Sequence, residues 1–254
     1  MSHKWKSAWV TGASSGIGRN LSIALAKKGV KVFASGRRED RLSEISKMSE
    51  NIIPLVMDVT DEKKLIKDTK IFTESTHNLP DLIILNAGIS RLFTVDNLDQ
   101  NYNLVKESID INYFGVMNCL KIIIPHFIKR KSGHIAIMAS VAGYRGLPNS
   151  IAYSPTKAAL INLAEVLKSE LRQYGITVSL INPGFVDTDA SKVNKFPMPS
   201  MVSIEYATKK IISGLEKSKY EIIFPFFFGL VLKMLRIMPN SLYFYFINKM
   251  IWKK

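Results

Sequence analysis

The fold is decided by the stretch Thr11-Gly12-Ala13-Ser14-Ser15-Gly16-Ile17-Gly18, which joins a short apolar segment at residues 7–11 to a segment of helical period at residues 16–28. Glycine lacks a Cβ, so its backbone can turn tightly and approach a pyrophosphate closely. The N-terminus of the following helix offers free N–H groups and the positive end of its dipole. The spacing is Gly-x3-Gly-x-Gly, which differs from the commoner Gly-x-Gly-x-x-Gly fingerprint. We predict a turn that binds the phosphates of a dinucleotide cofactor.

Short apolar runs rich in β-branched residues alternate with longer segments of helical period along the chain. Strands are expected at residues 7–11, 31–35, 52–58, 82–86, 134–139, 177–181 and 220–224. Helices are expected at residues 16–28, 100–129, 153–174 and 204–217. This order predicts the α/β class, with a Rossmann-type doubly wound, mostly parallel seven-stranded sheet, helices on both faces and apolar helices at the C-terminus. Ligands bind beyond the carboxyl ends of the strands in such sheets, and the motifs described below fall there.

Composition favours one globular domain. The chain has 254 residues, of which 47% are apolar and 22% are charged, and no linker or repeat divides it. We expect one domain over residues 1–254, with residues 226–254 as an apolar, basic helical extension. Cys119 is the only cysteine, and no apolar export segment precedes the first strand. Both features favour a reducing, cytoplasmic location.

The formal net charge of +14 suggests anionic partners, such as a phosphorylated cofactor or an anionic membrane. Nucleic acid is disfavoured because the lysines and arginines are spread along the chain without a recognised nucleic-acid motif. A metal site is not expected either, because the four histidines are scattered. They are His3, His77, His126 and His134.

The residues after the second predicted strand indicate which cofactor is preferred. NAD enzymes usually carry an acidic residue there, which accepts hydrogen bonds from the ribose hydroxyls. This chain instead has Arg37 and Arg38. A guanidinium can bind a 2′-phosphate through two hydrogen bonds, whereas a carboxylate would repel it. We predict that NADP(H) is preferred over NAD(H), although Glu39 and Asp40 follow closely and both arginines could instead be solvated loop residues.

A catalytic set is suggested by Tyr153 and Lys157, which lie four residues apart and so share a helical face. A free tyrosine has a pKa of about 10, and a nearby cation lowers it toward neutral pH. Ser140 follows the fifth predicted strand and precedes Tyr153 by thirteen positions. That spacing leaves room for a loop to bring the serine hydroxyl beside the phenol. The Tyr-x3-Lys pair alone is common, so its meaning depends on this context.

Several motifs together resemble one protein family. They are the turn at residues 11–18, Asn86-Ala87-Gly88, Asn112, the set of Ser140, Tyr153 and Lys157, and Pro183-Gly184. This combination closely resembles the compact, single-domain branch of the short-chain dehydrogenase/reductase family, over about residues 7–188. Two positions depart from the family pattern: Leu85 stands where a second asparagine is usual, and Pro155 replaces a small residue. Neither departure removes a reacting group.

The resemblance implies a role for each catalytic candidate. Tyr153 would be the general acid/base that protonates a carbonyl oxygen during reduction. Lys157 would hold the nicotinamide ribose and lower the pKa of the tyrosine. Ser140 would hydrogen-bond the substrate carbonyl, and Asn112 would anchor the water chain of a proton relay. The hydride itself would come from the cofactor.

The resemblance also implies cofactor contacts beyond the glycine turn. Asp58 and Val59 would border the adenine, and Thr188 would meet the carboxamide. The family often forms homodimers or homotetramers through its long helices, here residues 101–129 and 153–174. The residues expected to contact the cofactor are Gly12, Ser14, Ser15, Gly16, Ile17, Gly18, Arg37, Arg38, Asp58, Val59, Asn86, Ala87, Gly88, Tyr153, Lys157, Pro183, Gly184, Val186 and Thr188.

The C-terminal tail, residues 226–254, is apolar and basic, and no acidic residue follows Glu221. Lys233 and Arg236 would share a helical face opposite a Phe/Leu/Met surface. Such a helix suits the interface of an anionic membrane. Alternatively, the tail covers the substrate cleft or forms an oligomer interface. Each of these readings favours a lipophilic substrate, such as an acyl, steroid-like or isoprenoid carbonyl.

The sequence therefore predicts an NADP(H)-dependent oxidoreductase that reduces a lipophilic carbonyl or, with the same residues, oxidises the corresponding secondary alcohol. The enzyme would be cytoplasmic and could associate with the inner face of a membrane. An alternative is a membrane-associated NADP(H)-binding sensor or scaffold without turnover, but a pure binder needs no proton relay. A sugar-nucleotide epimerase is disfavoured by the glycine spacing and the short chain.

Overall fold

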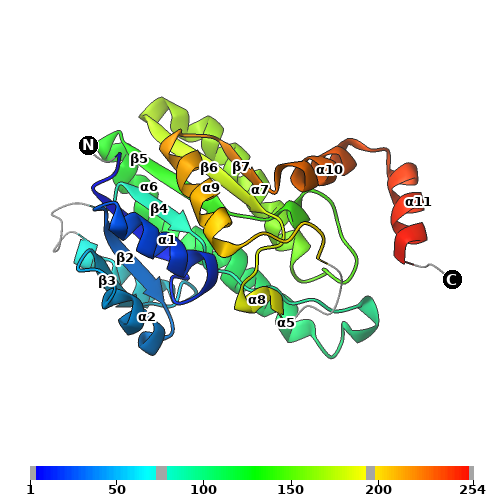
Figure 1. The fold of residues 1–254 in the computed structure, drawn as a ribbon, viewed down its shortest axis with the longest axis horizontal. Coiled ribbons are helices and arrows are strands. Elements are labelled where there is room, and N and C mark those ends of the chain that lie inside the picture. Colours follow the sequence, from blue (N-terminus) through cyan, green and yellow to red (C-terminus); the bar gives the residue numbers. More distant parts are fainter. Residues whose placement is uncertain (1–3, 73–78, 193–197, 252–254) are drawn as a thin grey trace.

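The computed structural model describes residues 4–72, 79–192 and 198–251. Its centre is a seven-stranded sheet in the order β3-β2-β1-β4-β5-β6-β7, and every neighbouring pair is parallel (Figure 1). The strands are β1 (Ser7–Thr11), β2 (Lys31–Gly36), β3 (Ile52–Val56), β4 (Leu82–Leu85), β5 (Gly133–Met138), β6 (Ile176–Pro183) and β7 (Glu221–Phe224). The strand order reverses between the central strands β1 and β4. In a doubly wound sheet, a ligand binds in the crevice beyond the carboxyl ends of the strands at this point.

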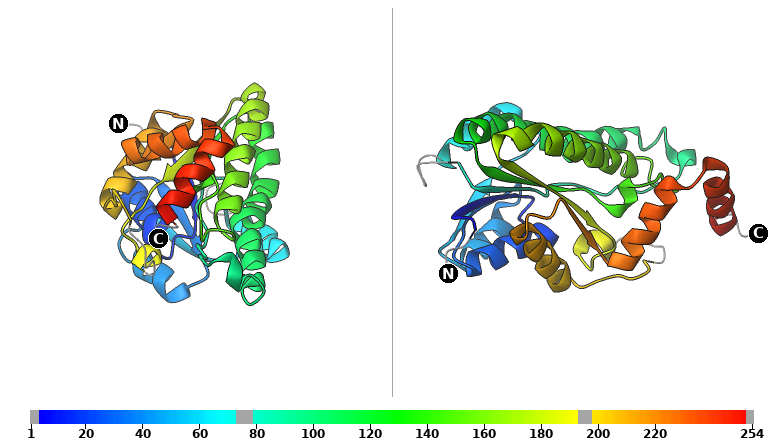
Figure 2. Two further views of the ribbon diagram at one scale, coloured as in Figure 1. Left: turned by 90° about the vertical axis from the view of Figure 1, so that its right-hand side faces the viewer. Right: turned by 90° about the horizontal axis from the view of Figure 1, so that it is seen from above.

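Helices cover both faces of the sheet (Figures 1 and 2). One face is covered by α3 (Glu62–Asp68), α6 (Gly115–Arg130) and α7 (Ser154–Glu170). The other face is covered by α1 (Gly16–Lys27), α2 (Glu39–Ser46) and α9 (Ile204–Glu216). Successive side chains of β1 point to opposite faces of the sheet and so join different helical layers. Trp9 joins the first hydrophobic cluster, while Ala8 and Val10 join the second.

The long helical stretch expected at residues 100–129 is not a regular α-helix. It consists of α5 (Tyr102–Ile109), a π-helical turn at Asp110–Phe114 and α6, and the Gly115 N–H bonds to the Asp110 carbonyl at the end of that turn. The run Tyr102–Arg130 is long and apolar enough to span a membrane by length and composition alone. Its apolar side is part of the core, where Val116, Leu120 and Phe127 are buried. Packing on the sheet therefore explains its composition.

The predicted element order is confirmed, with corrections at several ends. Strands β3 and β4 end before Asp58 and Asn86, so both side chains follow their strands. Strand β6 was expected to break before Pro183 but continues through it, because Pro183 pairs with Phe224 of β7. Three short helices, α2, α3 and α8 (Asp189–Lys192), were not predicted. Only Leu42 and Ile45 of α2 and Leu65 of α3 are buried, so these two helices have few apolar residues to mark a helical period, and α8 is only four residues long.

The tail forms α10 (Phe226–Ile237) and α11 (Asn240–Ile251), which lie at one end of the molecule and extend away from the sheet (Figures 1 and 2). Inward-facing groups attach them to the body. Phe228 and Leu232 of α10 pack against the core, and Tyr243 and Ile247 of α11 are buried. The tail thus docks on the end of the sheet where the catalytic candidates lie.

Candidate active site

The glycine turn places backbone against backbone at the carboxyl end of β1. Gly12 has φ +67°, and a Cβ at this position would lie 2.8 Å from the Ala87 Cα. A Cβ on Gly18 would lie 2.5 Å from the Asn86 Nδ2 and closer still to the Gly12 carbonyl oxygen. Gly16 also has a positive φ, +55°, but more space around it. Only glycine fits at 12 and 18, which is what a turn that cradles a pyrophosphate requires.

Asn86 and Ala87 are fixed to this turn by Thr11. The Thr11 hydroxyl accepts hydrogen bonds from the backbone N–H groups of Asn86 and Ala87, each at 3.0 Å. In return, the Asn86 side chain donates to the carbonyls of Thr11 at 2.9 Å and Gly12 at 3.3 Å. The end of β4 and the first turn are therefore one rigid unit. Leu85, which replaces a usual family asparagine, is buried in the core and takes no part in this unit.

Arg38 closes over the glycine turn. Its guanidinium donates to the Ser14 hydroxyl from Nε at 3.3 Å and from Nη2 at 3.1 Å, and Nη2 also donates to the Ser15 hydroxyl at 2.6 Å. Ser15 is the N-cap of α1, yet its side chain bonds to none of the first N–H groups of the helix. No acidic residue lies in the first turn of α1. The result is a cationic, donor-rich surface suited to a phosphate.

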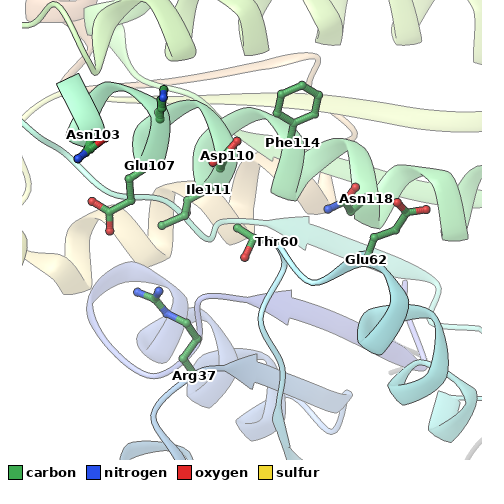
Figure 3. Close-up of a pocket in the computed structure, with 10 residues that line it drawn as sticks. Arg37, Thr60, Glu62, Asn103, Glu107, Asp110, Ile111, Phe114 and Asn118 are labelled. Atoms are coloured by element: carbon green, nitrogen blue, oxygen red, sulfur yellow. The ribbon is translucent and has the colours of Figure 1, made fainter.

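Arg37 points elsewhere and lines an open pocket of about 820 Å³ (Figure 3). In Figure 3 it lies across this pocket from the helical run that carries Glu107 and Ile111, with Thr60 between them. Thr60 is held by Asp58, whose Oδ1 accepts from its N–H at 2.9 Å and its hydroxyl at 2.8 Å. The neighbouring Val59 is buried, and its carbonyl accepts from the Asn118 side chain at 2.9 Å. Arg37 thus lines this pocket with Thr60 and Asn118, and Asp58 and Val59 hold these two residues in place.

Asn112 lies on the π-helical turn and is fully buried. Its Oδ1 accepts from the Ile89 N–H at 2.8 Å, and its Nδ2 donates to the Ile89 carbonyl at 3.0 Å. The same Nδ2 also donates to the Thr156 hydroxyl at 3.0 Å. The Asn112 amide therefore joins the segment after β4 to the first turn of α7, where Tyr153 and Lys157 lie. Thr156 was not singled out in the sequence, because a threonine between Tyr153 and Lys157 carries no signal of its own.

Tyr153, Lys157 and Ser140 come together at the carboxyl ends of β4 and β5. The Lys157 Nζ lies 5.6 Å from the centroid of the Tyr153 ring and donates to the Met138 carbonyl at 2.9 Å. A Cβ on Gly88 would lie 3.1 Å from the Asn112 Oδ1 and 3.4 Å from the Lys157 Nζ. These contacts bring Gly88, Asn112, Tyr153 and Lys157 into one site.

Burial governs the acid–base properties of this set. It raises the pKa of the Tyr153 phenol, and the hydrogen bond with the Ser140 side chain acts in the opposite direction. Burial also lowers the pKa of the Lys157 ammonium to about 8. At neutral pH the phenol is therefore protonated, and most of the Lys157 amine carries its charge.

The segment after β6 forms the opposite wall. The Ser140 hydroxyl lies 3.4 Å from the Pro183 carbonyl, and Gly184 follows directly. Val186 is buried and pairs with Val202. Thr188 lies beside the first turn, since a Cβ on Gly16 would be 3.7 Å from its methyl group. Pro183 and Thr188 therefore lie beside Ser140 and the glycine turn, whereas Val186 belongs to the second hydrophobic cluster.

Two groups at this wall were not identified from the sequence. A Cβ on Gly184 would lie 3.1 Å from the Phe228 ring of α10, and the rings of Phe185 and Phe228 are 5.7 Å apart between centroids. Glu221 accepts from the Tyr144 hydroxyl at 2.6 Å and from the Asn182 Nδ2 at 3.0 Å, and it also pairs with Lys233 of α10. Burial alone would raise the pKa of Glu221, but the bonds from Lys233 and Tyr144 outweigh it and lower this pKa. The feature of the sequence that could have identified Glu221 is that it is the last acidic residue before the tail.

Neither His134 nor Cys119 contributes to the site. Burial, with Lys4 and Lys168 nearby, lowers the pKa of His134 to about 3, and its Nε2 lies 2.9 Å from the Ser179 hydroxyl. Cys119 is buried in α6, and burial raises its pKa. His3 and His77 lie outside the described residues. Within the ranges the structure covers, no cluster of three or more His, Cys, Asp or Glu side chains could hold a metal ion.

Comparison with known proteins finds one family. Residues 6–196 match the family described as short chain dehydrogenase. An uncharacterized oxidoreductase of Myxococcus xanthus is 33% identical over 94% of this chain and 95% of its own length. The 3-oxoacyl-[acyl-carrier-protein] reductase FabG of Buchnera aphidicola is 33% identical over 85% of this chain and 92% of its own.

Solved structures show the same fold. A short chain dehydrogenase from Burkholderia cenocepacia in complex with NADP gives a TM-score of 0.81 at 23% identity, over 97% of this chain and 99% of that one. A short chain dehydrogenase/reductase from Burkholderia phymatum in complex with NAD also gives 0.81, at 21% identity, over 90% of this chain and 92% of that one.

Proposed function

The chain belongs to the short-chain dehydrogenase/reductase family, and from this premise we propose that it is an NADP(H)-dependent enzyme acting on a carbonyl or the corresponding secondary alcohol. The observation that carries the proposal is the convergence of Tyr153, Lys157, Ser140 and Asn112 beside the Gly12–Gly18 turn. A protein that only binds a nucleotide has no use for this set. The sensor or scaffold alternative therefore gains no support from the site.

The residues present fit a nicotinamide dinucleotide. The turn holds Gly12 and Gly18 in positions that a Cβ would fill, and the N-terminus of α1 has no side-chain cap. These groups would hold the pyrophosphate. Asp58 and Val59 would border the adenine, and Thr188 would meet the carboxamide. Lys157 would hold the nicotinamide ribose.

Preference for NADP(H) rests on Arg38 and its two serine partners. The hydroxyls of Ser14 and Ser15 already converge on this guanidinium, and a 2′-phosphate would replace them with stronger, charged acceptors. Arg37 adds a second cation at the same strand end. The carboxylates Glu62 and Glu107 line the same pocket as Arg37, so Arg38 is the residue on which the preference depends most.

When bound, the cofactor supplies or accepts the hydride. In reduction, the protonated phenol of Tyr153 donates its proton to the carbonyl oxygen, and the Ser140 hydroxyl donates a hydrogen bond to the same oxygen. The raised pKa of Tyr153 keeps it protonated at neutral pH, which suits this direction. The ammonium of Lys157 then stabilises the phenolate that forms. Asn112 orients the relay that returns the proton, because its amide fixes both the Ile89 segment and Thr156.

We propose a lipophilic substrate because Phe228 and Phe185 provide an aromatic wall next to Gly184 and Ser140. Burying a chain of methylene groups against such rings is worth about 0.8 kcal/mol for each group. An acyl carbonyl compound matches both this wall and the name of the Buchnera aphidicola relative, a 3-oxoacyl-[acyl-carrier-protein] reductase. We further propose a homo-oligomer that buries Phe114, Met117 and Val166, which are exposed along the helices of one face.

The test is oxidation of NADPH and NADH by the purified protein with carbonyl compounds of increasing chain length, alongside Tyr153→Phe. Turnover should rise with chain length and favour NADPH. It should fall by about 10²–10⁴-fold in Tyr153→Phe, because the proton donor is lost. Tyr206→Phe, on the exposed side of α9, is the matched control and should retain activity. Tight NADPH binding without turnover on any compound would instead support the sensor alternative.

A further inference from the structure

The outward side of the tail is apolar, the reverse of an ordinary surface helix. In α10 the exposed side chains recur at the spacing i, i+3, i+4, i+7, which forms one stripe. They are Phe227, Leu230, Val231 and Met234, and Phe227 is 80% exposed. Exposed apolar residues of α11 add to the same end of the molecule: Leu242, Phe244, Tyr245 and Phe246. We call these eight residues the tail face. Large apolar side chains exposed in this number at one end of a molecule indicate an interaction site.

Ion pairs of the basic residues of α10 fix the orientation of this helix on the body of the protein. Lys233 pairs with Glu221 of β7, and the Arg236 Nη1 lies 3.7 Å from the Glu165 Oε1 of α7. Both cations therefore pair with the body of the protein while their side chains stay half-exposed, and the apolar stripe faces outward. In α11 the Tyr243 hydroxyl donates to the Gly146 carbonyl, and the Arg145 guanidinium lies 4.4 Å from the centroid of the Tyr243 ring. The tail face is thus presented outward by polar contacts on its inner side.

The charges of the tail favour an anionic lipid surface over a second copy of this chain. No Asp or Glu follows Glu221, and the whole chain carries a formal net charge of +14. The basic residues not paired with the body include Lys249, which lies at the exposed end of α11 beside Tyr245. Two tail faces packed together would bring like charges close, whereas an anionic bilayer would complement them. Aromatic side chains beside lysines suit the boundary between headgroups and acyl chains.

We propose that the tail face binds the surface of an anionic lipid bilayer, with α10 and α11 lying in the plane of the interface. The helices span 12 residues each and do not cross the membrane. Phe227 enters the lipid while Phe228, its neighbour on α10, lines the crevice beside Gly184. One helix therefore connects the bilayer to the site. The binding itself does not depend on turnover of a carbonyl.

The test is flotation of the purified full chain with vesicles of phosphatidylcholine alone and of phosphatidylcholine mixed with phosphatidylglycerol. The wild-type protein should float with both and more with the anionic vesicles, an excess that high salt removes. The double variant Phe227→Ser, Phe244→Ser should bind at least about tenfold less, since two buried rings are lost. The matched control, Val95→Ser with Tyr102→Ser, removes exposed apolar groups away from the tail and should bind as the wild type does.

NADPH binding and the circular dichroism spectrum confirm that each variant is folded. The proposal is overturned if the wild-type protein does not float, or if the double variant floats as well as the wild type. It is also overturned if light scattering shows a dimer that the double variant converts to a monomer while vesicles bind neither protein. That result would assign the tail face to a second copy.

Discussion

The cofactor side and the substrate side of the crevice are built in different ways. On the cofactor side, residues 12–18 and 86–88, glycine backbone meets backbone at distances that leave no room for a Cβ. On the substrate side, residues 140–146, 183–188 and α10, side chain meets side chain: Phe228 on Phe185, Lys233 on Glu221, and Arg145 on Tyr243. A site made of backbone suits one invariant ligand, whereas a site made of side chains can be altered residue by residue. The two sides should therefore respond differently to mutation.

Lys157 lies where the two sides meet and gives the largest expected effect. Its pKa in the folded protein, about 8, lies below the usual lysine value of 10.5 because the ammonium is buried. Below pH 8 the Lys157 amine is charged in both the folded and the unfolded state, and the folded state carries the cost of burying that charge. Above pH 10.5 the amine is neutral in both states, so this cost is absent. The free energy of unfolding of the wild type, relative to Lys157→Met, should thus rise by up to roughly 3 kcal/mol between these pH values.

Denaturant titrations of both proteins at several pH values between about 7 and about 11 measure this difference. If the difference in the free energy of unfolding does not change with pH, the amine is not buried as a cation. Lys157 would then not lie between the cofactor side and the substrate side.

Gly18→Ala tests the rigidity of the cofactor side. The added methyl group would meet the Gly12 carbonyl and the Asn86 side chain, so we expect NADPH to bind at least about a hundredfold more weakly, roughly 3 kcal/mol. Gly146→Ala is the control on the substrate side, where a Cβ meets nothing within 4 Å. Fluorescence titration with NADPH gives both affinities. Equal affinities would mean that backbone contact does not distinguish the two sides.

Arg38→Leu should change the choice of cofactor without damaging the turn. Loss of a charged, bidentate donor is worth about 2 kcal/mol, so the preference for NADPH over NADH in kcat/KM should fall by about 30-fold. Arg41→Leu removes an exposed arginine from α2 and should leave the preference unchanged. If Arg38→Leu keeps the full preference, Arg37 would be the residue that reads the 2′-phosphate.

Phe228→Ala gives the smallest effect and belongs to the substrate side. The kcat/KM for long-chain carbonyls should fall by about tenfold, and that for short-chain carbonyls and the affinity for NADPH should change little. Phe227→Ala, one residue away but facing outward, is the matched control. Equal losses for both chain lengths would show that Phe228 supports the fold rather than the substrate.

The cofactor side could be predicted from the sequence because its constraints are local. Gly12, Gly16 and Gly18 lie within seven residues, and the strand ends at Asn86 and Ser140 follow from apolar runs. The substrate side depends on contacts distant in sequence, such as those of Glu221 with Tyr144 and Lys233. The sequence predicted that Lys233 and Arg236 oppose an apolar surface, and in the structure both pair with the body while Phe227 and Met234 are exposed. It could not predict which side faces outward, because that depends on the positions of Glu221 and Glu165.

The π-helical turn at Asp110–Phe114 sets the phase between two halves of one helical run. Asn103 of α5 and Asn118 of α6 line the same pocket, although fifteen residues would carry a regular α-helix about 60° past four full turns. The wide turn absorbs one residue and brings the two side chains into line. Deleting a single residue there would leave an unbroken helix in which α5 and α6 keep their relative rotation, because the wide turn already absorbs that residue. Asn103 and Asn118 would still line the pocket opposite Arg37, but the turn that holds the Asn112 amide against Ile89 would be lost while the fold stayed intact.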